Sequence, residues 1–236
     1  MLLILAGVSL FGSAVSLSGK EKERNNERHG RWEAAIRRFE EADRDDRRPR
    51  ESVLFVGSSS IRMWNLGKSF PEWASINHGF GGSQIDDSIH FADRIVWPFK
   101  PRMIVFYAGD NDIAAGKSAA RVAQDYATFS KMIHDQLPNT SMIFVAIKPS
   151  IARWKLSEGM EVANAAIATQ CEADDQRVFL NIWDPMLGDD GTPMKDLFLK
   201  DGLHLNAKGY GIWNDLLKVE LRKLNVELKT VPAVAE

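Results

Sequence analysis

The hydrophobic and polar positions from residue 53 onward alternate between short apolar runs and longer stretches of helical periodicity. Short runs rich in β-branched and aromatic residues are typical of buried strands, whereas apolar residues at every third or fourth position are typical of amphipathic helices. The predicted strands are 53–57, 74–78, 103–108, 142–148 and 177–183. The predicted helices are 84–95, 118–136, 157–173 and 207–224.

This alternation predicts βα units and a parallel sheet. Helices on both faces of five parallel strands would form an α/β fold, a three-layer α/β/α sandwich. Right-handed crossovers would place the carboxyl ends of all the strands at one edge of the sheet, where ligands bind in open α/β folds. Chemistry is therefore expected in the loops that follow the strands.

The chain before the first strand divides into two parts. Residues 1–19 are uncharged and mostly apolar, so they are a candidate signal peptide, a candidate membrane anchor or the product of a misassigned start. We expect export to the periplasm or outside the cell, with a cytoplasmic or membrane-anchored protein as the alternatives. Residues 20–52 are highly charged, and Trp32, Ile36 and Phe39 form an apolar stripe that predicts a peripheral helix, followed by a polar linker over 43–52. Residues 53–226 would form the main domain and 227–236 a C-terminal tail.

Composition narrows the classes of function. The 236 residues suffice for one large domain, and a formal net charge of −2 does not favour a nucleic-acid-binding surface. The single cysteine, Cys171, excludes an internal disulfide and a zinc site built from several cysteines, and its predicted helix favours a half-buried structural thiol. No closely spaced ligand motif indicates a metal, and no phosphate loop indicates a nucleotide or flavin. We expect no cofactor.

Three serines follow the first predicted strand directly. Ser58, Ser59 and Ser60 come after a glycine at the point where the apolar run ends. A serine at the carboxyl end of a parallel strand can serve as a nucleophile at the mouth of a crevice. Serine is also favoured in turns and as the N-cap of a helix, so a purely structural role is the alternative.

Three later loops would lie at the same edge of the sheet. Residues 77–83 hold three glycines, which suit close approach of the backbone to a ligand, although a plain glycine-rich turn has the same composition. Asn111 would bring an amide donor after the third strand, between Asp110 and Asp112, which could cap the next helix. Asp201 and His204 are separated by two residues, a spacing that lets the carboxylate fold back onto the imidazole.

Together these loops supply the groups that acyl transfer requires: a serine, a histidine base, an orienting carboxylate, and amide donors for an oxyanion. In the same chain order, the motifs G-S-S-S, G-F-G-G, G-D-N-D and D-G-L-H resemble the blocks of the SGNH hydrolases, also called GDSL-like esterases and lipases. The resemblance covers residues 53 to 224 and implies a flavodoxin-like fold with an exposed, shallow cleft. It also implies that the protein hydrolyses carboxylic esters.

The resemblance also implies the role of each site residue. Ser59 would be the nucleophile, His204 the base and Asp201 the orienting acid, while Gly82, Asn111 and the backbone N–H of Ser59 would bind the oxyanion. The family commonly has aspartate before the nucleophile, and this chain has Ser58. That departure removes a carboxylate from the turn and leaves the choice among the three serines open.

The ester itself is less defined by the sequence. Small or short-acyl esters, including acetylated sugars, are our preferred small-molecule substrates, with lysophospholipids and thioesters as alternatives of the same family. After the fourth strand, Arg153 could meet an anionic group and Trp154 a sugar face or an acyl chain, although packing also explains a tryptophan there. A non-catalytic carbohydrate-binding module is the alternative from another class.

Overall fold

The computed structural model describes residues 27–44 and 52–224. Its five strands are all parallel and pair in the order β2-β1-β3-β4-β5. Their bounds are Val53–Gly57 (β1), Ser75–Gly79 (β2), Met103–Tyr107 (β3), Ser141–Val145 (β4) and Arg177–Leu180 (β5). The five predicted strands are therefore confirmed, with ends that differ by at most three residues. Residues 146–148 were predicted to extend β4, but the strand ends at Val145. Its partner there is Leu180, the last residue of β5, so the pairing stops at this position.

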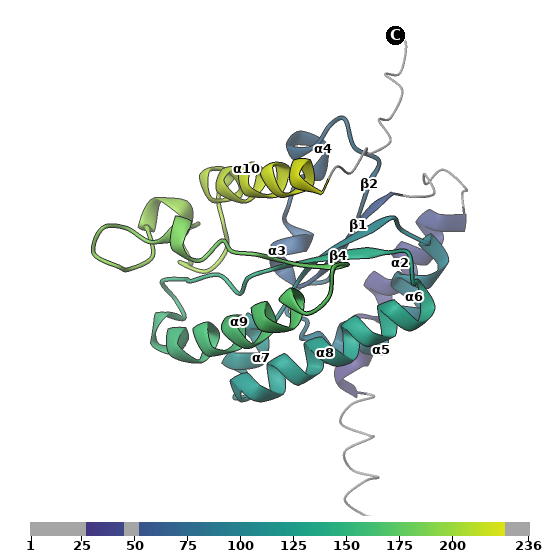
Figure 1. Ribbon diagram of the computed structural model, residues 1–236, viewed down its shortest axis with the longest axis horizontal. Coiled ribbons are helices and arrows are strands. Elements are labelled where there is room, and N and C mark those ends of the chain that lie inside the picture. The colour runs from purple at the N-terminus through teal and green to yellow at the C-terminus, as the bar shows by residue number, and fades with distance from the viewer. Residues whose placement is uncertain (1–26, 45–51, 225–236) are drawn as a thin grey trace, which may run out of the picture.

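Helices cover both faces of this sheet, which confirms the predicted three-layer sandwich (Figure 1). The helices are α2 (Glu33–Arg44), α3 (Ser59–Arg62), α4 (Leu66–Ser69), α5 (Ile85–His90), α6 (Ala92–Ile95), α7 (Asp110–Ala114), α8 (Ala119–Gln136), α9 (Ser157–Glu172) and α10 (Ala207–Lys223). Four short 3-10 helices are Trp97–Phe99, Trp154–Leu156, Asp184–Met186 and Lys195–Leu197. The helix predicted over 84–95 is divided at Phe91, whose ψ of 6° departs from helical geometry.

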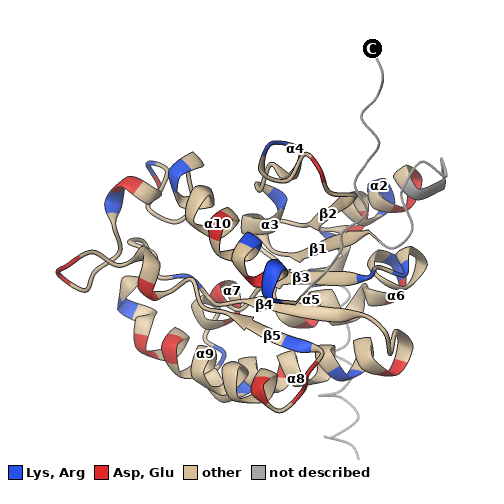
Figure 2. Cartoon of the chain, turned by 45° about the horizontal axis from the view of Figure 1, so that its top comes forward, with Lys and Arg blue, Asp and Glu red and all other residues tan. Residues whose placement is uncertain are grey.

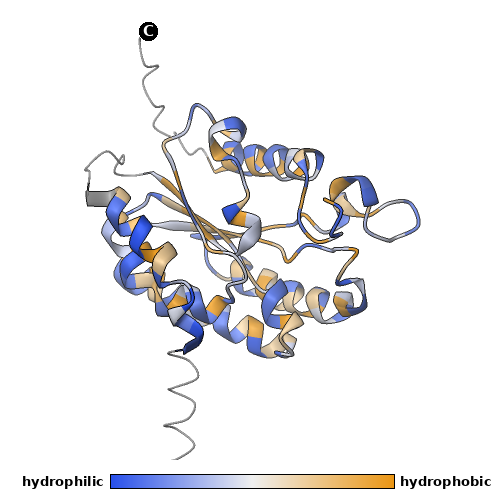
Figure 3. Ribbon diagram, turned by 180° about the vertical axis from the view of Figure 1, so that it is seen from behind, coloured by the Kyte–Doolittle hydropathy of each residue, from blue (hydrophilic) through white to orange (hydrophobic). Residues whose placement is uncertain are grey.

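Successive residues of each strand enter opposite cores, because side chains alternate across a pleated sheet. In β1, Leu54 and Val56 face a core shared with α2, α5, α8 and α9, whereas Val53 and Phe55 face one shared with α3, α4 and α10. Figure 3 shows the strands as mainly hydrophobic, and Figure 2 shows most charged residues on the helices and loops. Both faces of the sheet are buried, so its strands read as continuous apolar runs.

The apolar stripe of the charged N-terminal segment docks α2 on the domain. Trp32 and Ile36 are buried, and the ring of Phe39 stacks on His78 with centroids 4.3 Å apart. Arg94 of α6 also pairs with Glu33 at 2.8 Å. The candidate signal or anchor over 1–19, most of the predicted linker and the tail over 227–236 lie outside the described residues. None of the helices within 27–44 and 52–224 has the length and apolarity that a bilayer crossing requires.

The strand order places the candidate chemistry around β1. Its neighbours β2 and β3 continue to opposite sides of the sheet, so β1 lies where the strand order reverses. Such a switch point is where ligands bind in open parallel sheets. The serines after β1, the glycine run after β2 and Asn111 after β3 all leave the same edge there.

Candidate active site

Ser59 is the first residue of α3, directly after the turn that ends β1. Gly57 makes this turn with a φ of +138°, and a Cβ there would lie 1.9 Å from the carbonyl oxygen of Tyr107, so only glycine fits. The N–H of Ser58 donates to that same oxygen at 3.0 Å. Ser58 and Ser60 are buried, whereas Ser59 is partly exposed. Of the three serines, Ser59 alone presents its side chain toward the surface.

Asp201 and His204 meet through a tight local turn. One carboxylate oxygen of Asp201 accepts from the backbone N–H groups of Leu203 and His204, both at 2.9 Å. The other lies 2.6 Å from Nδ1 of His204. The hydrogen bond from the imidazole, followed by those from the two backbone N–H groups, holds the pKa of Asp201 far below its usual range. The carboxylate is therefore ionised and fixes the proton of His204 on Nδ1.

The other imidazole nitrogen reaches the candidate nucleophile. Nε2 of His204 lies 3.1 Å from Oγ of Ser59, although the two residues are 145 positions apart in the chain. With Nδ1 protonated, Nε2 has a free lone pair and accepts the hydrogen bond of the hydroxyl. Ser59, His204 and Asp201 thus form one chain of hydrogen bonds, the arrangement that lets a serine lose its proton as it attacks a carbonyl.

The glycine run forms a loop beside Ser59. The N–H of Phe80 donates to the carbonyl of Gly57 at 2.8 Å, and Gly82 has a φ of +79°, which favours glycine. The guanidinium of Arg62 lies against Gly81, where a Cβ would come within 3.0 Å of its Nε. Gly82 follows the end of β2 and Ser59 follows the end of β1, so both lie at the same edge of the sheet.

Asn111 completes this group of polar residues. Its Nδ2 donates to the carbonyl of Ser83 at 3.0 Å, and its Oδ1 accepts from Nη2 of Arg153 at 3.0 Å. An amide nitrogen carries two hydrogens, so one remains to bind an oxygen. The residues predicted from the sequence as nucleophile, base, orienting acid and oxyanion donors thus lie at one edge of the sheet, in loops and in the first turns of α3 and α7.

Comparison with known proteins identifies the family. The sequence profile of the GDSL-like Lipase/Acylhydrolase family matches residues 60–212, more than half of the chain. The chain belongs to this family. The match begins one residue after Ser59 and includes Gly82, Asn111, Asp201 and His204. The predicted resemblance is confirmed, and this GDSL-like protein is a carboxylic ester hydrolase.

Solved structures share the fold of this GDSL-like hydrolase at low identity. A Streptococcus pneumonia protein whose name refers to platelet activating factor has a TM-score of 0.74 and 19% identity, with 87% of this chain and 99% of that one covered. A GDSL-like lipase from Bacteroides thetaiotaomicron has a TM-score of 0.70 and 20% identity, with coverages of 80% and 98%. A carbohydrate esterase family 3 protein from Talaromyces cellulolyticus has a TM-score of 0.58 and 20% identity, with coverages of 74% and 99%. No curated protein sequence matches the chain significantly.

A buried ion cluster lies behind Asn111 in this GDSL-like hydrolase. Asp110 pairs with Nζ of Lys148 at 3.1 Å and with Nη1 of Arg153 at 3.0 Å, and Lys148 also contacts the hydroxyl of Tyr107 at 3.0 Å. Burial opposes ionisation of Asp110, but the charges of Lys148 and Arg153 outweigh it and lower the pKa of Asp110. No role for Lys148 was predicted from the sequence. The signal was a lysine that ends an otherwise apolar run, directly before a proline.

Neither aspartate beside Asn111 caps its own helix, contrary to the expectation from the sequence. The N-cap of α7 is Gly109, without a side-chain cap. Asp112 instead accepts from the N–H of Ile85, the first residue of α5, at 3.2 Å, and pairs with Lys117 at 2.9 Å. Burial raises the pKa of Asp112 to about 6. Tertiary packing brings the α5 N-terminus to this carboxylate, which secures the end of the glycine loop to α7.

The two residues suggested as substrate contacts are both engaged with the protein. The guanidinium of Arg153 binds Asp110 and Asn111, as described above. Trp154 is partly buried against the core beneath α8 and α9, and its ring stacks on Trp183 with centroids 6.1 Å apart.

Cys171 is buried in α9, with its sulfur 3.1 Å from the hydroxyl of Tyr126.

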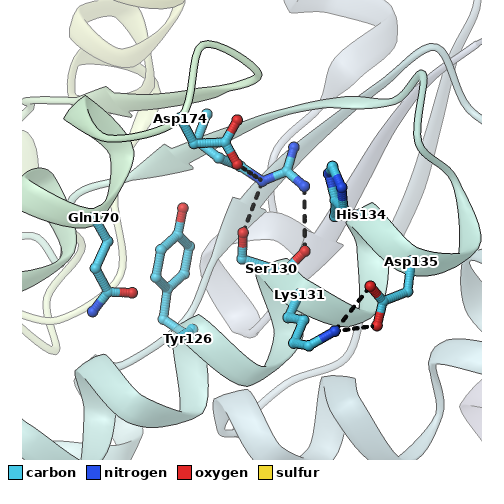
Figure 4. A pocket seen from close by; sticks show the side chains of 9 residues that line it. Tyr126, Ser130, Lys131, His134, Asp135, Gln170 and Asp174 are labelled. Carbon is cyan, nitrogen blue, oxygen red and sulfur yellow. Dashed lines mark hydrogen bonds and ion pairs between the residues drawn. The ribbon is translucent and has the colours of Figure 1, made fainter.

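A separate groove of about 420 Å³ lies at the opposite edge of the sheet, beside the first residue of β5 (Figure 4). Arg177 donates to Oγ of Ser130 at 2.7 Å there, and Lys131 pairs with Asp135. The groove is lined by Tyr126, Ala127, Ser130, Lys131, His134, Asp135, Gln170, Asp174 and Arg177. The ion pairs here are local, between Lys131 and Asp135 within α8 and between Arg177 and Asp174 at 3.8 Å, and they lie away from the Ser59 site.

Proposed function

We propose that the protein hydrolyses small or short-acyl carboxylic esters at Ser59 through an acyl-enzyme. The observation that carries this proposal is the continuous chain from Oγ of Ser59 to Nε2 of His204 at 3.1 Å and from Nδ1 of His204 to Asp201 at 2.6 Å. In this arrangement the histidine takes the serine proton and the carboxylate stabilises the imidazolium that forms.

In the first half of the reaction, Oγ of Ser59 attacks the ester carbonyl while its proton moves to Nε2 of His204. The carbonyl oxygen becomes an oxyanion, which the backbone N–H groups of Ser59 and Gly82 and the free N–H of Asn111 bind. Donors that are fixed before the charge develops lower the barrier without the cost of reorganisation. Collapse of the tetrahedral intermediate passes the proton from His204 to the departing alcohol and leaves an acyl-enzyme.

In the second half, a water molecule takes the place of the alcohol. His204 accepts its proton as the water oxygen attacks the acyl carbon, and the same three donors bind the second oxyanion. Collapse returns the proton from His204 to Oγ of Ser59 and releases the carboxylic acid. The cycle thus returns Ser59 and His204 to their starting protonation states.

The preference for small esters, including acetylated sugars, has one further source of support. The Talaromyces cellulolyticus neighbour is named as a carbohydrate esterase, although at 20% identity this likeness concerns the fold. Lysophospholipids and thioesters remain the alternative substrates. A panel of p-nitrophenyl acetate, butyrate and octanoate, acetylated xylo-oligosaccharides, a lysophospholipid and an acyl thioester distinguishes them. Turnover confined to the lysophospholipid would contradict the short-acyl assignment.

A fluorophosphonate probe tests the proposed nucleophile. We expect mass spectrometry of the digested protein to find one adduct, on Ser59, which disappears in Ser59→Ala and in His204→Ala. Ser58→Ala and Ser60→Ala are matched controls because these neighbouring hydroxyls are buried, and both should keep the adduct. Labelling of Ser58 or Ser60 in the wild type would reassign the nucleophile. A folded wild type that is neither labelled nor active on any ester would favour the non-catalytic binding module.

A further inference from the structure

The segment before the domain is attached to α5 and α6, the two helices that follow the glycine loop. At its start, Nε of Arg28 donates to Asp87 of α5 at 3.0 Å. Further along, Glu33 and Glu40 of α2 both bind Arg94 of α6, at 2.8 and 2.6 Å. These contacts hold the residues between them, at positions 31 and 32, in one place against the glycine loop. The residues that this segment contributes all lie before residue 60, where the family match begins.

Two side chains of this segment bind the loop itself. Nε1 of Trp32 donates to the carbonyl of Gly81 at 3.0 Å, and Nη2 of Arg31 donates to the carbonyl of Gly82 at 3.1 Å. Trp32 is buried and packs edge-on against Phe80, with ring centroids 5.7 Å apart. The guanidinium of Arg31 lies over the Trp32 ring, 3.7 Å from its centroid. This contact helps to hold the side chains of Arg31 and Trp32 in place relative to each other.

The bond from Trp32 acts on the peptide group that carries the proposed oxyanion donor. The carbonyl of Gly81 and the N–H of Gly82 belong to one peptide unit, which is planar and has these two groups pointing in opposite directions. Fixing the carbonyl oxygen therefore fixes the direction of the N–H. Glycine has the widest choice of backbone dihedrals, so a loop with glycine at 79, 81 and 82 needs such external contacts to keep one orientation.

The next two carbonyls of the loop are held as well. Arg31 binds that of Gly82, and Nδ2 of Asn111 binds that of Ser83 at 3.0 Å. Three successive carbonyls, from 81 to 83, thus each accept a side-chain hydrogen bond. Two of the three donors come from the segment before the domain, and the third comes from a residue with an oxyanion-binding role of its own.

We propose that Trp32 and Arg31 are positioning residues that orient the Gly82 N–H for the oxyanion, so that the N-terminal segment forms part of the catalytic apparatus. This inference rests on the proposed function, since it takes Gly82 as an oxyanion donor. The segment acts through the peptide plane and has no need to touch the substrate. A misplaced donor weakens transition-state binding more than substrate binding, which lowers kcat and leaves KM nearly unchanged.

The test uses the full chain with Trp32→Phe, which keeps an aromatic ring against Phe80 and removes the indole N–H. We expect kcat for p-nitrophenyl acetate to fall about 10-fold, short of the 10²–10³-fold that loss of a whole oxyanion donor costs. KM should change little, and the melting temperature should remain close to that of the wild type. Inhibition by a boronic acid, which forms a tetrahedral adduct on the serine, should weaken in parallel. A purely structural role would not lower kcat and weaken boronic acid inhibition together while the melting temperature stays the same.

Two matched controls exist in the chain. Trp73→Phe removes another indole N–H, from a ring that stacks on Phe70 at 4.1 Å, and should leave kcat unchanged. Arg31→Met should lower kcat, whereas Arg37→Met, which removes an exposed guanidinium paired with Glu33, should not. Since p-nitrophenyl acetate is neutral, a loss in Arg31→Met cannot come from a missing charge contact with the substrate.

The outcomes separate this inference from the proposed function. A wild type that is labelled on Ser59 and active, with Trp32→Phe equally active, overturns the positioning role and leaves the esterase intact. A fall in kcat that simply follows a lower melting temperature also overturns it. A wild type without labelling and without activity overturns the proposed function, and the positioning role with it.

Discussion

Arg153 donates from Nη2 to Oδ1 of Asn111 at 3.0 Å, so the amide of Asn111 is oriented before any substrate arrives. The amide group is planar, and its nitrogen already donates one hydrogen to the carbonyl of Ser83. The direction of the second hydrogen is therefore set by Arg153 and Ser83 together. Preorganisation of this kind is what gives an oxyanion donor its effect on the barrier.

Asn111→Ala removes this proposed oxyanion donor, and we expect α7 to keep its backbone conformation. We expect kcat for p-nitrophenyl acetate to fall by about 10²–10³-fold, which corresponds to roughly 2.7–4 kcal/mol of barrier. Steady-state kinetics measure the loss, and circular dichroism checks that the variant is folded. Near-normal turnover by a folded variant would remove Asn111 from the oxyanion site.

Arg153→Met tests whether the orientation of Asn111 matters. Asp110 keeps its contact with Lys148, so the buried carboxylate still has a counter-charge. We expect kcat to fall about 10-fold, less than in Asn111→Ala, because the amide donor is present but no longer fixed. Arg153→Lys keeps the charge but not the fork that spans both partners, and it should recover only part of the rate. An unchanged kcat in Arg153→Met would contradict this role.

Lys148→Met leaves the carboxylate of Asp110 buried without one of its two cations. Removing one partner of a buried pair typically costs about 3–5 kcal/mol of unfolding free energy, and the contact of Asp110 with Arg153 should keep the loss near the lower end. Urea denaturation measures it. The double variant Lys148→Met with Asp110→Asn should regain much of the loss, since it buries no uncompensated carboxylate.

The loss of stability in Lys148→Met should also depend on pH. In the wild type the pKa of Asp110 lies below its ordinary 3.8, so its stabilising contribution is present above that pH and is lost as the pH falls through the lowered value. Without Lys148 the pKa of Asp110 rises and the carboxyl can take up a proton. The difference in unfolding free energy between wild type and Lys148→Met should therefore narrow as the pH is lowered. An equal difference at neutral and acidic pH would contradict this.

Asp201→Asn keeps the shape of the turn and removes the charge that faces His204. We expect kcat to fall by roughly 10³–10⁴-fold, because an amide no longer favours the proton on Nδ1 or stabilises the imidazolium. The lowered pKa of Asp201 also means that the residue stays ionised at every pH above its ordinary 3.8. The pH profile of wild-type kcat/KM should thus show no ionisation of Asp201 above that pH. A small effect of the variant on kcat would exclude the orienting role.

Gly79→Ala tests the contact between the end of β2 and α3. A Cβ at this position would lie 2.1 Å from the backbone nitrogen of Arg62, so α3 would have to move, and Ser59 with it. Overpacking of this kind costs about 1–3 kcal/mol, and the shifted nucleophile should lower kcat as well. Gly211→Ala in α10 is the matched control, because nothing lies within 4 Å of its added Cβ. Full activity and stability in Gly79→Ala would contradict the close approach.

Local patterns in the sequence were sufficient for the fold and for part of the site. The five apolar runs identify the five strands because both faces of a parallel sheet are buried. The pair of Asp201 and His204 is also predictable, since one turn of four residues brings the carboxylate to the imidazole. The stripe of Trp32, Ile36 and Phe39 predicts a docked helix from helical periodicity alone.

Other relationships depend on packing between distant segments. The sequence does not show that Ser59, rather than Ser58 or Ser60, faces His204, because burial of the two neighbours is decided by how α3 sits on the sheet. The aspartates beside Asn111 read as helix caps, yet one neutralises the buried Lys148 and the other holds the start of α5.

The sequence by itself thus determined the succession of strands and helices along the chain, the edge of the sheet at which the polar site residues lie and the types of these residues. Those features follow from local periodicity and from the parallel arrangement that βα units impose. Only the tertiary structure decided that Arg153 orients Asn111 and that Trp32 binds the carbonyl of Gly81. Such hydrogen bonds join residues 42 and 49 positions apart, and their geometry depends on how helices and loops pack on the completed sheet.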